Sequence, residues 1–410
     1  MTWKPWLGAV PDAAGTHFRV WAPKVDALAA NVLGGPTVPL RRDAEGYFTG
    51  RADGVRSGAR YFYRFPDGRE RPDPASLLQP QGVHGPSEIV DLAEIAPRSA
   101  RARVPLEKLV FCEIHLGTYT VEGTADAAAR YMPELAEALY TAVEVMPVAA
   151  FAGPRTLPPV RRYFVENALR WVSRAAGGFD GLRLDAIHGI YDDSPRHILQ
   201  EIAEVVHAEG ALVIAESDLN DVKLVERYHL DGSWADDLHH AIHVALTGES
   251  QGYYADFQDP MPKMVAAIER GWFYEGQHKP SFGLKHGTPA AHLRARHFVV
   301  CAQNHDQIGN RARGERLTEL TDTGGVRAAA AIVALQPALP LYFQGEEWAA
   351  REPFQYFVSH TDQALVEAVR KGRQEEFKGF AWSDVPDPFA EETFRRSRID
   401  RSRKDEEALR

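Results

Sequence analysis

The amino-acid sequence predicts an α/β fold with a small antiparallel β unit in front of it. From about residue 109 the chain alternates strand-like apolar runs with helix-like segments, which is typical of a parallel sheet with crossover helices. Residues 1–93 instead carry β-forming residues between Gly, Pro and Asp turns. A chain of 410 residues is long enough for two or three domains with a large buried core.

The first 93 residues predict an antiparallel sandwich. β-Forming residues alternate or cluster at 17–21, 46–50 and 61–65, and turn residues separate these runs. The following stretch, 71–97, is rich in Pro and polar residues and predicts a connection to the next domain. We therefore expect a β-sandwich over 1–93, a parallel α/β domain over 94–360 with an interruption near 152–160, and a charged helical segment over 361–410.

Seven parallel strands are predicted after this connection. They are 109–115, 141–146, 182–185, 211–216, 232–236, 298–303 and 340–343. Helices fit between most of them, and residues 160–173 place Phe164, Ala168, Trp171 and Val172 at helical spacing.

Composition excludes several classes of partner. The net charge is −10 and no run rich in Lys or Arg stands out, so we expect no nucleic-acid partner, and neutral sugars suit the chain better. There is no apolar leader and no run of about eighteen apolar residues, which predicts a cytoplasmic protein without membrane contact. Cys112 and Cys301 lie in apolar runs, so we expect buried free thiols and no disulfide, and no Cys/His spacing resembles a ligand set, so we expect no metal site.

Three carboxylates follow strand-like runs and carry the chemistry. They occur in Gly-Leu-Arg-Leu-Asp at 181–185, Leu-Val-Ile-Ala-Glu at 212–216 and Gln-Asn-His-Asp at 303–306. Each alone could be the N-cap of a following helix. Together they match the needs of retaining glycoside hydrolysis, in which one carboxylate is the nucleophile and a second is the acid. We therefore predict Asp185 as nucleophile, Glu216 as acid/base and Asp306 as transition-state stabiliser.

These segments resemble the α-amylase clan of glycoside hydrolases, and within it the maltooligosyltrehalose trehalohydrolases. The narrower resemblance covers most of residues 10–400 and depends on longer motifs: Glu-Ile-His-Leu-Gly-Thr-Tyr-Thr at 113–120, Trp-Ala-Asp-Asp-Leu-His-His at 234–240, Gly-Tyr-Tyr-Ala-Asp-Phe at 252–257, Gln-Asn-His-Asp-Gln-Ile-Gly-Asn-Arg at 303–311, Gln-Gly-Glu-Glu-Trp at 344–348 and Pro-Phe-Gln-Tyr-Phe at 353–357.

The resemblance implies a (β/α)8-type barrel preceded by a glycan-binding-module-like sandwich. It implies hydrolysis of the α-1,4 bond next to the terminal trehalose of maltooligosyltrehalose, with water as acceptor and no cofactor. Two alternatives stay open. One is an α-glucan branching or debranching enzyme, which shares the sandwich and the three acids. The other is an inactive α-glucan-binding protein.

The sequence departs from the clan at the third barrel strand. The clan ends that strand with an Asp-x-x-x-Asn-His motif that helps to hold the sugar ring, and no such motif occurs between 146 and 182. The β-patterned C-terminal domain of the family is also absent, and residues 395–407 are highly charged, which predicts a solvated helix or frayed tail. Either this is a shortened form, or the printed sequence omits stretches of a longer protein.

The predicted sugar contacts surround the three acids. Arg183 lies two residues before Asp185, so both side chains point to one face of the strand and the cation is expected to orient the nucleophile. Glu216 must stay protonated to act as an acid, which burial near other negative charge favours. The further predicted substrate-binding residues are His188, Trp234, Asp236, Asp237, His239, His240, Tyr253, His305, Gln307, Asn310 and Glu346.

One cluster among them allows a second interpretation. Asp236, Asp237, His239 and His240 could chelate a metal ion, because two His and two Asp lie within five residues. Neighbouring positions on a strand or helix point in different directions, however, and the family resemblance favours sugar contact over metal binding.

Overall fold

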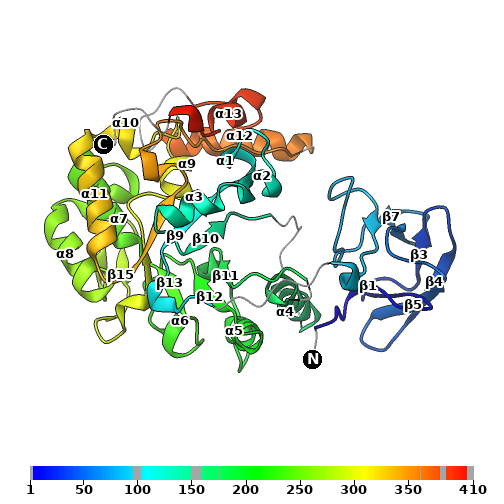
Figure 1. The fold of residues 1–410 in the computed structure, drawn as a ribbon. Helices are drawn as coiled ribbons and strands as arrows, with labels where there is room; N and C mark the ends of the chain where they lie inside the picture. The colour runs from blue at the N-terminus through cyan, green and yellow to red at the C-terminus, as the bar shows by residue number, and fades with distance from the viewer. Residues whose placement is uncertain are drawn as a thin grey trace.

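The computed structural model describes residues 3–95, 103–148, 158–174, 176–360, 362–378 and 385–403. They form an antiparallel sheet of eight strands, a parallel sheet of seven strands and one small hairpin. Figure 1 shows the antiparallel sheet beside the helix-covered parallel sheet.

The N-terminal unit is one continuous sheet in the order β1-β2-β5-β4-β3-β6-β7, with β8 on β6. Its inward side chains share one core, which includes Phe18, Phe48 and Tyr61. The predicted β unit is confirmed, although its layers belong to a single curled sheet. The strands are β1 (Gly8–Pro11), β2 (Gly15–Trp21), β3 (Leu28–Val32), β4 (Thr37–Arg42), β5 (Tyr47–Asp53), β6 (Arg60–Arg64), β7 (Glu70–Arg71) and β8 (Ser87–Glu88).

The second sheet contains all seven predicted parallel strands, in the order β10-β9-β17-β16-β13-β12-β11. Every neighbouring pair is parallel. Five observed strands are shorter than predicted, β11 is shifted by one residue and β17 begins one residue earlier. Except in β17, the last predicted residues instead begin the loops after the strands. The strands are β9 (Phe111–Ile114), β10 (Ala142–Val145), β11 (Gly181–Leu184), β12 (Leu212–Ala215), β13 (Gly232–Trp234), β16 (Phe298–Val300) and β17 (Leu339–Phe343).

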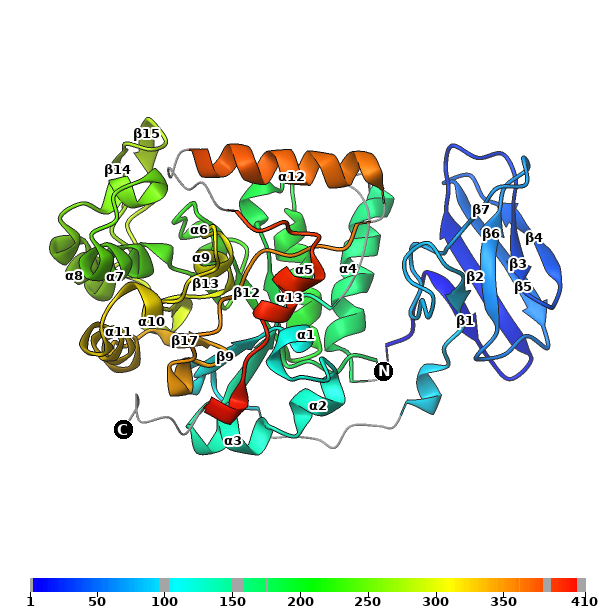
Figure 2. The ribbon, with the colours of Figure 1, turned by 90° about the horizontal axis from the view of Figure 1, so that it is seen from above.

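Helices cover the outside of this sheet and cross one of its ends (Figures 1 and 2). The predicted helix before β11 is confirmed as α4. The α-helices are α1 (Leu116–Tyr119), α2 (Ala125–Ala129), α3 (Met132–Glu137), α4 (Pro158–Val172), α5 (Ile198–Ala208), α6 (Lys223–Glu226), α7 (Asp236–Thr247), α8 (Pro260–Arg270), α9 (His305–Gly309), α10 (Leu317–Leu320), α11 (Thr323–Leu335), α12 (Gln363–Lys378) and α13 (Glu391–Arg396). Within the described ranges, none of the helices has the length and apolar character needed to cross a bilayer.

Shorter elements complete the chain. The hairpin pairs β14 (Gln277–Lys279) with β15 (Leu284–His286). The 3-10 helices are η1 (Leu92–Glu94), η2 (Leu106–Lys108), η3 (Ile187–Gly189), η4 (Gly252–Phe257), η5 (Ala295–His297), η6 (Glu346–Trp348) and η7 (Arg401–Arg403).

The parallel sheet is open between β10 and β11, and we call this opening the seam. β10 pairs only with β9, and β11 pairs only with β12. No strand lies between them among the residues that the structure describes, as the missing third-strand motif predicts. Side chains still meet across the seam, because Nε of Arg183 on β11 lies 3.9 Å from Oε1 of Glu144 on β10. The predicted interruption near 152–160 falls mostly outside the described residues.

The N-terminal unit docks on α4, the helix that leads into β11. The Trp6 ring lies between two guanidinium groups, with its centroid 4.5 Å from Cζ of Arg19 and 3.8 Å from Cζ of Arg162 on α4. Arg170 of α4 donates to the carbonyl oxygens of Ser76 and Leu77, at 2.9 and 2.6 Å. These cation–π and charge-assisted contacts tie the β unit to one edge of the parallel sheet.

Part of the charged C-terminal segment is packed and not solvated, so this prediction is wrong for Ser397, Ile399 and Arg401. Ser397 and Ile399 are buried, and the amide of Ile399 donates to the carbonyl of Thr118. The guanidinium of Arg401 lies 4.2 Å from the ring centroid of Tyr119, 4.0 Å from that of Tyr131 and 5.0 Å from that of Trp348. A charged residue can be buried in this way because aromatic faces attract a cation, which the charge pattern alone does not indicate.

The two cysteines are free thiols in the core, as predicted. Cys112 lies in β9 and Cys301 directly follows β16. Burial raises the pKa of both thiols well above the ordinary range, so they stay protonated and unreactive.

We predict that Arg170→Ala lowers the free energy of unfolding by about 2 kcal/mol, because it removes two charge-assisted bonds between α4 and the N-terminal unit. Denaturation followed by circular dichroism measures the change. Arg174→Ala is the matched control, because Arg174 is exposed just beyond α4, and it should stay within about 0.5 kcal/mol of the parent. Equal stability of the two variants would contradict the docking role.

Candidate active site

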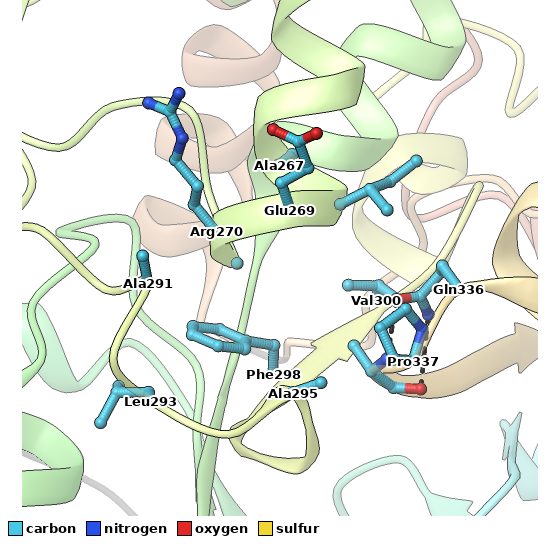
Figure 3. Close-up of a pocket in the computed structure, with 13 residues that line it drawn as sticks. Ala267, Glu269, Arg270, Ala291, Leu293, Ala295, Phe298, Val300, Gln336 and Pro337 are labelled. Atoms are coloured by element: carbon cyan, nitrogen blue, oxygen red, sulfur yellow. Dashed lines mark hydrogen bonds between the residues drawn. The ribbon is translucent and has the colours of Figure 1, made fainter.

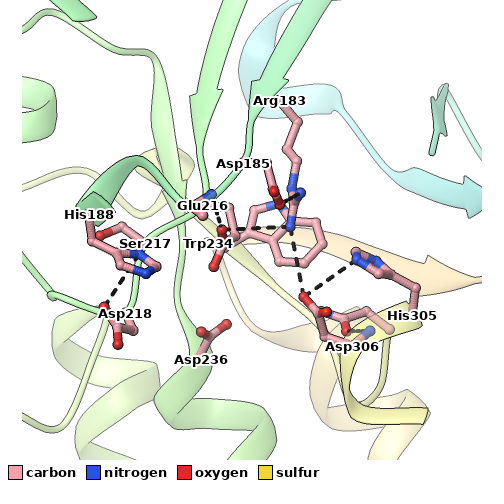
Figure 4. Close-up of polar contacts among 12 residues, drawn as sticks. Arg183, Asp185, His188, Glu216, Ser217, Asp218, Trp234, Asp236, His305 and Asp306 are labelled. Atoms are coloured by element: carbon pink, nitrogen blue, oxygen red, sulfur yellow. Dashed lines mark hydrogen bonds and ion pairs between the residues drawn. The ribbon is translucent and has the colours of Figure 1, made fainter. Parts of the chain in front are cut away.

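Three acids meet at the carboxyl ends of the parallel strands. Asp185 directly follows β11, Glu216 directly follows β12, and Asp306 lies in the first turn of α9 after β16. Parallel strands deliver their following loops to one end of the sheet, which is where catalytic groups of such barrels gather. Figure 4 shows the three side chains pointing toward the same guanidinium group, that of Arg183.

Arg183 faces four carboxylates, one on β10, one in α9 and two directly after β11 and β12. Its Nη1 forms an ion pair with Asp185, and its Nη2 lies 4.0 Å from an oxygen of Glu216 and 4.0 Å from an oxygen of Asp306. The fourth carboxylate is Glu144, across the seam. Burial alone lowers the pKa of an arginine, but these acids outweigh it and raise the pKa of Arg183 above its ordinary value. The site is therefore organised around one permanent cation.

Glu216 has the environment of a general acid. Burial raises the pKa of its carboxyl group, while the amide of Ala186, whose nitrogen is 2.5 Å from Oε2, and the charge of Arg183 oppose part of that rise. Nearby Asp236 adds repulsion that favours the protonated form. Ala186 has a φ of 45°, an uncommon conformation for a residue with a side chain. This turn aims its amide at Glu216.

Asp185 has a different environment although it shares the same arginine. Its side chain is 69% exposed, whereas that of Glu216 is 15% exposed. An accessible carboxylate beside a cation suits attack on a substrate atom, and a buried carboxyl suits proton donation. The two acids thus differ in burial although they lie beside one cation.

Asp306 is held by His305 as well as by Arg183. Nε2 of His305 lies 3.4 Å from Oδ2 of Asp306. Burial raises the pKa of Asp306, and the two cationic neighbours, His305 and then Arg183, lower it in part. The predicted position of His305 beside the acids is therefore observed.

The predicted Trp234 contact takes a different form. Trp234 is 3% exposed, and its ring centroid lies 4.3 Å below Cζ of Arg183. A sugar ring has no access to a face that the guanidinium already covers. The structure therefore corrects this assignment, because Trp234 supports Arg183 from the barrel interior and offers no open stacking surface.

Asp236 and His239 lie near the acids, with Oδ1 of Asp236 3.2 Å from Nε2 of His239. The same His239 nitrogen lies 3.0 Å from Nε2 of Gln307. Figure 4 shows Asp236 facing the space between Glu216 and Asp306. These three predicted residues are brought together in one hydrogen-bonded group at the site.

Asp237 is placed elsewhere, which corrects its assignment as a sugar contact. It is 3% exposed, and its Oδ2 accepts hydrogen bonds from the amides of Phe273 and Tyr274 and from the side chain of Asn220, at 2.7, 2.9 and 3.0 Å. A carboxylate with three donors and no exposure has a structural role. Because Asp236 and Asp237 point to different partners, the alternative metal cluster is not formed either.

The remaining predicted residues lie at varied positions. Nδ1 of His188, in the loop after β11, lies 3.5 Å from Oδ1 of Asp218, in the loop after β12, and both side chains are part-exposed. His240 and Tyr253 pack ring to ring with centroids 5.0 Å apart. Asn310 lies 3.4 Å from a guanidinium nitrogen of Arg373. Tyr253 is half-buried, and His188 is exposed.

Glu346 does not form the predicted rim contact. Its Oε1 accepts a hydrogen bond of 2.7 Å from the amide of Phe343, and burial raises its pKa to about 8. The carboxyl group is therefore used to close the turn after β17. The sequence pattern predicted that Glu346 lies in the loop after β17. It did not indicate that the side chain turns back to bind the backbone of that strand.

Sequence reasoning missed two acids of the site, Glu113 on β9 and Glu144 on β10. Glu113 is 1% exposed and binds His305, and Glu144 reaches Arg183. Burial, then the nearby charge of Glu113, raises the pKa of Glu144. The sequence did contain an indication of both residues, because buried parallel strands are almost entirely hydrophobic and an acid within one is unusual.

A cavity of about 140 Å³ lies between α8 and the start of β16 and β17 (Figure 3). Its lining includes Phe298, which begins β16, and Pro337, which precedes β17. It contains no part of the acid cluster. Among the residues that the structure describes, no group of three or more His, Cys, Asp or Glu side chains is arranged to hold a metal ion.

Comparison with known proteins gives consistent relatives. No protein-family model matches the chain. A malto-oligosyltrehalose trehalohydrolase from Deinococcus radiodurans is 38% identical over 96% of this chain and 78% of the relative, and one from Saccharolobus solfataricus is 35% identical over 89% of this chain and 79% of the relative. The first match extends over 482 residues, more than the 410 of this chain, so that relative has residues inside the matched region with no counterpart here.

Solved structures show the same fold. A provisionally named alpha amylase from Salmonella typhimurium superposes with a TM-score of 0.93 and 31% identity, covering 99% of this chain and 84% of the other. A pullulanase from Anoxybacillus, solved with maltotetraose, has a TM-score of 0.63 and 14% identity over 91% of this chain and 73% of its own. The second likeness concerns the fold alone.

Proposed function

This chain belongs to the malto-oligosyltrehalose trehalohydrolase family, and we propose that it hydrolyses the α-1,4 bond next to the terminal trehalose of maltooligosyltrehalose, releasing trehalose. It is a glycoside hydrolase with the fold of the α-amylase enzymes. The observation that carries the proposal is the convergence of Asp185, Glu216 and Asp306 on one buried arginine.

The acids divide the reaction between them. Asp185 attacks the anomeric carbon while Glu216 gives its proton to the leaving oxygen, which produces a glycosyl-enzyme intermediate. Glu216, now ionised, then takes a proton from water as the water breaks that intermediate. Asp306 stabilises the positive charge that develops on the sugar ring in both steps.

Further residues are proposed to hold the sugars. His305, Asp236, His239 and Gln307 belong to the hydrogen-bonded group around the acids. Their donors and acceptors match the hydroxyl groups of a pyranose ring. His188, His240, Tyr253 and Asn310 are proposed as outer contacts.

Two alternatives are weaker. Pullulanases share only the fold with this chain, at 14% identity, so debranching has less support than trehalose release. The open seam is an argument for an inactive glucan-binding protein. The three acids nevertheless converge on Arg183, and this convergence favours catalysis.

We also propose a division of the chain at about residues 93 and 360. Residues 1–93 are the β unit, 94–360 carry the parallel sheet and the acids, and 361–410 are a charged helical segment. Separate hydrophobic cores in the first two regions support the first boundary.

Incubation with maltooligosyltrehalose tests the function. The products, separated by anion-exchange chromatography, should be trehalose and the shortened maltooligosaccharide. Maltooligosaccharides without the trehalose end are the control substrate and should react far more slowly. A change in the branching of an α-glucan without release of trehalose would favour the rival enzyme class.

We predict that Asp185→Asn and Glu216→Gln each lower kcat by at least about a thousandfold, because each removes a chemical role, with circular dichroism unchanged. Asp193→Asn is the control, since Asp193 is an exposed acid in the loop after β11, and it should keep near-parental kcat. Near-parental turnover by either active-site variant would disprove its assigned role.

The dependence of kcat/KM on pH should be bell-shaped. The reaction needs a protonated acid and an ionised nucleophile together, and activity disappears as pH rises through the pKa of Glu216, because the acid then has no proton to give. Burial raises the pKa of Glu216, which places this upper limb above the ordinary range of a glutamate. Initial rates across pH 3 to 10 measure it, and a rate that climbs steadily into alkaline pH would contradict a carboxylic general acid.

A further inference from the structure

We propose that Glu113 is a positioning residue that acts on Asp306 through His305, so that a buried acid on β9 sets the orientation and charge of the site histidine. The inference deepens the proposed function and rests on it. Its central contact can be tested without any measurement of activity.

Glu113 is committed to His305 by two bonds. One carboxylate oxygen lies 2.5 Å from Nδ1 of the ring, and the other accepts a hydrogen bond of 3.1 Å from the backbone amide of His305. Glu113 is only 1% exposed, so no water competes for these positions. The backbone bond places the start of α9, and the ring bond fixes the rotation of the imidazole.

The opposite side of the same ring faces the acid cluster. With Nδ1 facing Glu113, Nε2 faces Oδ2 of Asp306 at 3.4 Å, and in the protonated ring both nitrogens carry a hydrogen that these two carboxylates can accept. That same oxygen lies 4.0 Å from Nη2 of Arg183. Asp306 therefore lies between His305 and Arg183, and Glu113 binds the side of the His305 ring that faces away from Asp306.

Charge balance around the imidazole favours its protonated form. Burial lowers the pKa of His305, but the Glu113 carboxylate, through its charge and its hydrogen bond, and then Asp306 raise it to about 9. The titratable and charged groups that face His305 are Glu113 and His115 from β9 and the residue after it, Glu144 from β10, Arg183 from β11, and Asp306 from α9. Glu113 is the only one of these bound directly to Nδ1.

Histidine NMR tests the contact directly. In the unmodified protein, the imidazole of His305, assigned by the loss of its signals in His305→Gln, should titrate near pH 9. Glu113→Gln keeps the side-chain size but removes the charge, and should lower that midpoint by about 1–3 pH units. A midpoint near 6.5 in the unmodified protein would overturn the proposal even if the variant failed to fold.

Kinetics test the consequence for catalysis. Glu113→Gln should lower kcat by about a hundredfold, with a smaller change in KM, because loss of orientation acts on the transition state. In a His305→Asn background, Glu113→Gln should have little further effect, since the route through the ring is already absent. If the loss of kcat in the double variant equalled the product of the losses in the two single variants, Glu113 would act independently of His305, and the proposal would be overturned.

Glu226→Gln is the matched control, because Glu226 also contacts a histidine, with Oε1 2.6 Å from Nε2 of His292, but on the exposed surface. It should leave kcat and the His305 titration unchanged. If the unmodified protein released no trehalose, the proposed function would fail, whereas the His305 titration would still decide whether Glu113 controls the imidazole.

Discussion

The guanidinium group of Arg183 is the constraint on which the site depends. It lies near the end of β11 with 11% of the side chain exposed, and carboxylates of Asp185, Glu216, Asp306 and Glu144 surround it. Four acids this close would repel one another strongly without a cation between them. An arginine suits this position because it remains charged when buried and presents several donors in a rigid plane.

Asp185 and Glu216 lie beside the same cation but differ in burial, so their chemical environments differ. Asp185 stays open to solvent beside Arg183, whereas Glu216 is covered and its pKa rises. Two carboxyl groups can therefore serve as nucleophile and acid at one pH. The ring of Trp234 packs against the guanidinium group of Arg183. An aromatic side chain of the interior therefore helps to position the cation of the site.

The seam shows how an open sheet can keep this geometry. β10 and β11 share no hydrogen-bonded ladder, but Arg183 and Glu144 meet across the space between them. On the outer side, α4 is tied to the N-terminal unit through Trp6 and Arg170. β11 is thus positioned by the contact between Arg183 and Glu144 and by the docking of the N-terminal unit on α4. These contacts partly replace the strand pairing of a closed barrel.

The sequence by itself determined the strand order along the chain, the three acids and the family. Apolar runs that end in an acid are local patterns, and local patterns survive without knowledge of the fold. Only the tertiary structure decided which neighbouring polar residues face the site: Asp236 does, whereas Asp237 binds the amides of Phe273 and Tyr274. It also revealed Glu113 and Glu144, because the partners of a buried charge come from strands far apart in sequence, and only packing brings them within bonding distance.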